Sequence, residues 1–141
     1  MVDLQKGEQY VNMDYIFLRT LINVPIHRLL VVYDITCQWS KRLFHRIKDF
    51  PSTMQVQLDQ AKVTFAIPKG HIKSHGKNCQ SIYSLNYLQG SAQMDGEGVE
   101  RDWAQMNALV PSIREMGPGN RRETLDDHWD GWNWEKIKKF G

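Results

Sequence analysis

Acidic residues stand at two places where an α/β protein could use them for chemistry. Asp34 follows the apolar run from Leu29 to Tyr33, and open α/β sheets place their sites at the C-terminal ends of strands. Glu97 and Glu100 lie in a glycine-containing stretch and in the first turn of a predicted helix. The alternative for Asp34 is a turn or cap role, and for the glutamates a helix-start charge. These three residues are the acids that could belong to a functional site.

A second set of side chains could bind a transition metal. His71, His75 and Cys79 are spaced four residues apart and would share one face of a helix. Zinc prefers cysteine and histidine, and structural zinc sites use four ligands, so Cys37 is the candidate fourth. The chain has no Cys-x-x-Cys pair, and a hydrogen-bonded structural cluster is the alternative. With two cysteines and no signal-peptide pattern, we expect reduced thiols.

Basic and aromatic residues in the second half could contact nucleic acid. Arg101 adjoins Glu100 and could pair with an acid or a phosphate. Arg121 and Arg122 open the last predicted helix and could contact phosphates. The three tryptophans between positions 129 and 134 could stack on bases, but a role in covering a core is favoured. Acids between the basic residues favour a solvated face. The net charge of +2 does not by itself indicate a nucleic-acid partner.

The composition is that of one folded domain. The chain has 141 residues, of which 41% are hydrophobic and 24% charged, and this excludes a disordered or collagen-like protein. The longest uninterrupted apolar run is residues 29–33, whereas about 20 apolar residues are needed to span a bilayer. The sequence therefore predicts no transmembrane helix.

Helix and strand patterns alternate in the first half of the chain. Residues 5–23 repeat apolar groups at steps of three and four, which predicts a helix that ends before Pro25. Residues 28–35 include a β-branched apolar run without alternation, which predicts a strand buried on both faces. Thr36 is the predicted cap of a helix over residues 37–49.

The second half begins with another strand pattern. Residues 62–68 predict a short buried strand, and residues 72–88 a helix that would carry His75 and Cys79. Residues 89–98 contain three glycines and are predicted to form a loop.

Two further helices complete the pattern. Residues 99–116 are periodic but contain Pro111, which predicts a kink or a break. Residues 117–119 form a clear break, and Asn120 is the expected cap of a last helix over residues 121–140. The order of elements indicates an α/β layer protein. Because two strands are too few for a free-standing sheet, we expect the rest of the sheet to lie upstream of this chain.

Short motifs spread over nearly the whole chain match one family when taken together. They are DLQKGEQY at 3–10, NMDY at 12–15, YDITCQW at 33–39, PKGH at 68–71, DGE at 95–97, ERDW at 100–103, EMGPG at 115–119 and TLDDH at 124–128. No single motif is generic, and all occur in order at plausible spacing. The chain resembles the KDZ (Kyakuja-Dileera-Zisupton) transposases, which are abundant in basidiomycete fungi.

The resemblance implies an RNase H-like fold with a DDE-type active site, in which three carboxylates hold two divalent ions. It makes Asp34 the second acid and Glu100 the third, with Glu97 as the other choice, and Mg²⁺ or Mn²⁺ the metal. It also implies transposon-end and target DNA as partners, a nuclear location and no membrane. The set Cys37, His71, His75 and Cys79 includes a group similar to a structural Cys/His motif of related transposases, where Zn²⁺ could bind.

The first acid of such a site has no candidate. It should lie on a strand ahead of the first helix, but Asp3 falls in no strand pattern and Asp14 falls inside the helix. We therefore expect residues 1–141 to be a single partial domain of the catalytic region, inactive alone. It would be helix-rich, with few strands because the N-terminal strands are missing. The alternatives are a catalytically dead DNA- or protein-binding module and a zinc-stabilised structural domain.

Overall fold

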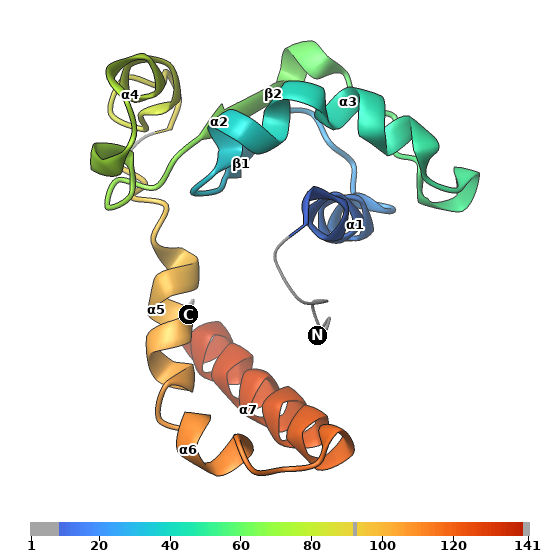
Figure 1. Ribbon diagram of the computed structural model, residues 1–141, viewed down its shortest axis with the longest axis vertical. Coiled ribbons are helices and arrows are strands. Elements are labelled where there is room, and N and C mark those ends of the chain that lie inside the picture. Colours follow the sequence, from blue (N-terminus) through green and yellow to red (C-terminus); the bar gives the residue numbers. More distant parts are fainter. Residues whose placement is uncertain (1–8, 92, 140–141) are drawn as a thin grey trace. The chain divides into compact units, whose positions relative to one another are not determined.

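The computed structural model describes residues 9–91 and 93–139, which fall into two compact units. The sheet unit lies within residues 9–99, and the helical unit within residues 100–139 (Figure 1). The chain is a helix-rich α/β protein with a two-stranded parallel sheet. Among the helices of the described ranges, none is long and apolar enough to cross a membrane.

The sheet consists of β1 (Leu29–Val32) and β2 (Val63–Ala66), which pair in parallel along their whole length. Both lie inside the runs predicted as strands, at residues 28–35 and 62–68. The expectation that the first strand is buried on both faces is wrong, because all four residues of β1 are half-buried. In the part of the chain that the structure describes, the sheet has two strands, so each strand has one unpaired edge.

The first helix, α1 (Tyr10–Leu21), buries Leu18 on its inner face. Its predicted start at residues 5–8 lies outside the described residues, and Gln9 is extended rather than helical. The helix ends before Pro25, as predicted.

The helix predicted over residues 37–49 is broken into short pieces. The backbone at Arg42 departs from helical geometry, because its φ of −124° and ψ of 16° lie outside the helical region. The pieces are α2 (Thr36–Trp39), η1 (Ser40–Arg42), α3 (Leu43–Arg46) and η2 (Ile47–Asp49), where η marks a 3₁₀ helix.

Thr36 does not cap this segment. Ile35 takes the N-cap position, and Thr36 is the first helical residue. The hydroxyl of Thr36 is buried and forms no hydrogen bond within the described residues. The Asp34 carboxylate instead accepts a hydrogen bond of 2.7 Å from the Ile35 N–H. The side chain of Asp34, two residues before the predicted cap, therefore shapes the turn into α2.

Trp39 is the centre of the core in the sheet unit. Its side chain is 1% exposed, and its ring meets three other aromatic rings edge-on: Phe17 at 5.4 Å, Tyr33 at 5.8 Å and Phe65 at 6.1 Å between centroids. Such edge-to-face pairs add roughly 0.5–1.5 kcal/mol each to the burial itself. One tryptophan therefore joins α1, the end of β1 and β2.

A buried ion pair docks α1 onto the pieces that follow β1. Asp14 is fully buried, and Arg46 donates to it through Nε at 2.6 Å and through Nη2 at 2.9 Å. Trp39 Nε1 donates a third bond to Asp14 at 2.8 Å. The carboxylate is thus neutralised and hydrogen-bonded, which is what makes a buried acid tolerable.

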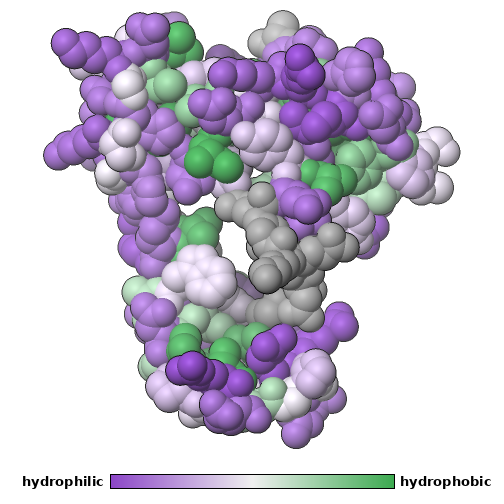
Figure 2. All heavy atoms as spheres, in the orientation of Figure 1, coloured by the Kyte–Doolittle hydropathy of each residue, from purple (hydrophilic) through white to green (hydrophobic). Residues whose placement is uncertain are grey.

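The connections of the sheet unit are short helical turns. They are η3 (Ser52–Met54), η4 (Gln60–Lys62), η5 (Ile72–Ser74) and α4 (Lys77–Tyr83). On the face drawn in Figure 2, hydrophilic side chains predominate over this unit and apolar ones are scattered among them. Scattered apolar side chains are an ordinary feature of a protein surface.

The last three helices are α5 (Gly98–Met106), α6 (Val110–Ile113) and α7 (Pro118–Lys138). The predicted break occurs before Pro111 rather than at it, because Pro111 fits the first turn of α6, where its missing N–H costs nothing. Asn120 is not the cap of the last helix. Gly117 takes that position, and the helix begins at Pro118.

A polar group joins α5 to α7 in the helical unit. Asp102 accepts from Trp132 Nε1 at 3.0 Å and pairs with Lys136 Nζ at 2.7 Å. The hydrogen bond from Lys136, and to a smaller extent that from Trp132, holds the pKa of the Asp102 carboxyl below its ordinary value. The expected core role of the tryptophans fits half-buried Trp132 but not Trp134, which is 61% exposed.

Candidate functional site

Asp34 lies at the carboxyl end of the parallel sheet. It follows β1 by two residues, is half-buried, and is held by the Ile35 N–H described above. The carboxyl ends of parallel strands are the usual position for sites in open sheets. The placement expected from the sequence is therefore the placement found.

The loop at residues 95–97 packs against the same end of the sheet. The Lys69 N–H donates to the Asp95 carbonyl at 2.9 Å, which joins the loop to the segment after β2. A Cβ on Gly96 would lie 2.7 Å from Val32 Cγ1 and 3.1 Å from Pro68 Cα, and its φ is +79°. Only glycine permits both that conformation and that close approach.

Glu97 is fixed beside this contact. Its carboxylate accepts a hydrogen bond of 2.7 Å from the Gly70 N–H, and its own N–H donates to Asp95 Oδ1 at 2.9 Å. Because Gly96 contacts Val32 at the end of β1, Glu97 and Asp34 both belong to the carboxyl end of the sheet. The sequence did not indicate this role of Gly96, although a glycine between two acids is a usable signal.

Glu100 lies in the first turn of α5, as predicted. It is the first residue of the helical unit, whereas Asp34 and Glu97 belong to the sheet unit. Arg101 follows it in the same helix. Arg121 and Arg122 lie in the first turns of α7, where Arg122 is exposed and pairs with Asp126 at 3.9 Å.

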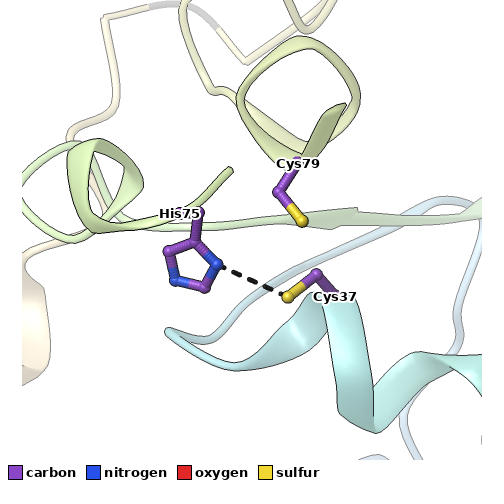
Figure 3. Close-up of side chains that lie close together, drawn as sticks. All are labelled: Cys37, His75 and Cys79. Carbon is purple, nitrogen blue, oxygen red and sulfur yellow. Dashed lines mark hydrogen bonds between the residues drawn. The ribbon is translucent and has the colours of Figure 1, made fainter. Parts of the chain in front are cut away.

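Three of the four expected zinc ligands come together in the sheet unit. In Figure 3, the side chains of Cys37 from α2 and Cys79 from α4 lie close to that of His75, which follows η5. Their ligand atoms all lie within 4.8 Å of one another, and Cys37 Sγ is 3.5 Å from His75 Nδ1. Cys37 is buried and the other two are half-buried. This group, the Cys-His-Cys cluster, could hold a metal.

The fourth expected ligand, His71, lies outside the cluster. One helix over residues 72–88 is a wrong prediction, because η5 ends at Ser74 and His75 is extended, with a ψ of 154°. Helix α4 then begins at Lys77. Because of this break, His71, His75 and Cys79 do not share one helix face. Their spacing of four residues therefore does not bring His71 to the other two ligands.

The thiols of the cluster have an apolar setting. Both cysteines are free, and Cys37 packs in a small core with Ile67 and Ile72, against which Tyr83 also lies. Burial raises the pKa of the Cys37 thiol, and the neighbouring sulfur of Cys79 raises it further. Without a metal, this thiol therefore stays protonated at neutral pH.

The comparisons with known proteins agree with the motifs. The family model described as KDZ, Kyakuja-Dileera-Zisupton transposase, matches residues 1–133. That span includes both strands and every element up to residue 133 within α7. The chain therefore belongs to the KDZ transposase family, and the resemblance drawn from the motifs is confirmed. Neither the curated proteins nor the solved structures contain a match to it.

Proposed function

We propose that this chain is part of the catalytic region of a KDZ transposase, an RNase H-like enzyme of the DDE type that cleaves and joins DNA. One observation carries the proposal: Asp34 and Glu97 are both anchored at the carboxyl end of a parallel sheet. Family membership supports the reaction and the substrate, which would be transposon ends and target DNA in the nucleus.

The acids would act as metal ligands. When bound, a pair of Mg²⁺ or Mn²⁺ ions would activate the attacking oxygen and stabilise the leaving oxygen of a phosphodiester. Asp34 would offer carboxylate oxygens whose orientation is set by the Ile35 N–H. Carboxylates of this kind suit hard divalent cations.

Two residues compete for the role of the third acid. The string Glu100-Arg101-Asp102-Trp103 resembles that of other transposases and favours Glu100. The contact with the Gly70 N–H favours Glu97, because it fixes this carboxylate on the unit that holds Asp34. Arg101, Arg121 and Arg122 would contact DNA phosphates.

Asp14 does not supply the first acid. Its carboxylate is fully buried and satisfied by Arg46 and Trp39. Of the candidate acids in the sheet unit, Asp34 and Glu97 lie at the sheet edge, and the first of the three acids that DDE chemistry uses has no candidate among the described residues. We therefore expect the chain alone to bind divalent metal without performing strand transfer.

Metal titration tests this proposal directly. We expect Mn²⁺ binding by the full chain, followed by electron paramagnetic resonance, to weaken about tenfold or more in Asp34→Asn, which is about 1.4 kcal/mol. Asp49→Asn is the matched control, because Asp49 is exposed in η2. Glu97→Gln and Glu100→Gln identify the third acid. Equal affinities in Asp34→Asn and Asp49→Asn would remove Asp34 from the site.

A second candidate is a structural domain stabilised by zinc, in which the fold persists without chemistry. The Cys-His-Cys cluster favours it, because two thiols and an imidazole suit Zn²⁺. Unchanged Mn²⁺ affinity in all three acid variants, together with stoichiometric zinc, would select this candidate.

A further inference from the structure

We infer that the Cys-His-Cys cluster binds one Zn²⁺ that ties the connection after β1 to the connection after β2, with a water molecule as fourth ligand. The ligand atoms come from both connections: Cys37 from the first, and His75 and Cys79 from the second. The sheet itself joins these strands by four residue pairs alone. A metal at this point would therefore cross-link the end of the sheet where its backbone pairing stops.

The spacing of the ligand atoms fits zinc. Zn–S bonds of about 2.3 Å and Zn–N bonds of about 2.0–2.1 Å, at a tetrahedral angle, place sulfur and nitrogen about 3.5 Å apart. Cys37 Sγ and His75 Nδ1 are 3.5 Å apart. Cys79 Sγ lies within 4.8 Å of Cys37 Sγ and of a ring nitrogen of His75, so all three residues can offer a ligand atom to one ion.

The chemistry of the cluster selects a soft or borderline metal. Two thiolates and an imidazole bind Zn²⁺ well and Mg²⁺ poorly. The surrounding core of Ile67, Ile72 and Tyr83 offers few oxygen ligands. The second thiol, from Cys79 of α4, lies within 4.8 Å of the other two ligand atoms and supplies a third donor of the kind that zinc prefers.

The backbone of the cluster is held in place before metal binds. The Gln80 side chain donates to the His75 carbonyl at 2.6 Å, and the His75 N–H donates to the Ile72 carbonyl at 3.1 Å. Cys37 lies in the first turn of α2, three residues after Asp34. Zinc would thus also fix the turn that carries Asp34. The relevance of this effect to catalysis rests on the proposed function, in which Asp34 is a metal ligand.

Metal analysis of the full chain, purified under reducing conditions, tests this inference. We expect one zinc per chain by mass spectrometry of the metal, and a Co²⁺-substituted protein with the intense absorption of sulfur-to-cobalt charge transfer. Cys79→Ser should lose that absorption and weaken Zn²⁺ binding by more than the roughly 10–100-fold that loss of an outer partner costs. His45→Ala, which changes an exposed histidine of α3, is the control and should keep both.

Other outcomes would overturn the inference. A chain without stoichiometric zinc, equal Zn²⁺ affinities in Cys79→Ser and His45→Ala, or a Cys37–Cys79 disulfide in place of metal would each do so. Cys79 is half-buried, so Cys79→Ser tests the cluster even where Cys37→Ser fails to fold. Neither readout involves DNA or Mn²⁺, so the zinc site and the acid site can fail independently.

Discussion

Two acids of the sheet unit, Asp14 and Asp34, lie in contrasting settings. Asp14 is fully buried and receives its hydrogen bonds from the Arg46 guanidinium and the Trp39 indole. Asp34 is half-buried and accepts from the Ile35 backbone N–H. A guanidinium cancels the charge of a carboxylate, whereas an amide orients the carboxylate and leaves its charge in place. The partner, more than the acid itself, distinguishes a structural role from a metal-binding one.

The largest expected effect comes from breaking the structural pair. Arg46→Leu leaves the Asp14 carboxylate buried without its cation, which we expect to lower the free energy of unfolding by about 3 kcal/mol. Urea unfolding followed by tryptophan fluorescence measures this. Arg42→Leu is the control, because Arg42 is exposed in the neighbouring turn. Equal stabilities in the two variants would show that Asp14 does not need its partner.

The next effect probes the loop at residues 95–97, which packs against the sheet end that Asp34 follows. Gly96→Ala must adopt a φ of +79° and place its Cβ 2.7 Å from Val32 Cγ1, so we expect a loss of about 2 kcal/mol. Gly90→Ala has a similar φ of +83° but meets no atom within 4 Å, so we expect about 1 kcal/mol from backbone strain alone. Thermal unfolding compares them. A smaller loss in Gly96→Ala than in Gly90→Ala would mean that the loop does not pack on the sheet.

A smaller effect is expected in the helical unit. The pKa of Asp102 is lowered by Lys136 and Trp132, so its stabilising contribution is present above the ordinary value of 3.8 and is lost as pH falls through the lowered one. We expect Asp102→Asn to cost less than about 1 kcal/mol at pH 7, since the pair is partly exposed.

Circular dichroism of thermal unfolding at pH 7 and below pH 3 checks this. The difference between Asp102→Asn and the wild type should shrink at the acid end. Glu135→Gln, which alters an exposed pair with Lys138 within α7, is the control. A difference that grows as pH falls would reverse the assigned sign.

The sequence predicts some parts of this protein well because they depend on local patterns. Apolar β-branched runs identify both strands, and Asp34 follows the first of them as expected. Contacts between distant residues leave no such pattern. Nothing within α1 marks Asp14 as the partner of Arg46, 32 residues away.

The Cys-His-Cys cluster was predicted in part, because three of its expected members come together and the fourth does not. The residue types were sufficient to group Cys37, His75 and Cys79, but the regular spacing also suggested His71. The periodicity of residues 72–88 concealed the extended backbone at His75, which ends η5 and separates it from α4. A Gly at position 76 was the local signal that a single helix is not continuous there.

The smallest expected effect on stability is the sharpest test of the contrast between Asp14 and Asp34. Asp34→Asn keeps the shape of the side chain and an oxygen that can accept from the Ile35 N–H, so we expect a change in the free energy of unfolding within about 0.5 kcal/mol. The same variant should lose Mn²⁺ affinity, because a neutral amide holds a divalent cation more weakly than a carboxylate does. Arg46→Leu should show the opposite combination, with a large loss of stability and Mn²⁺ binding retained by the folded fraction. If Asp34→Asn instead unfolds the protein as Arg46→Leu does, Asp34 is a second structural acid, and the contrast between Asp14 and Asp34 disappears.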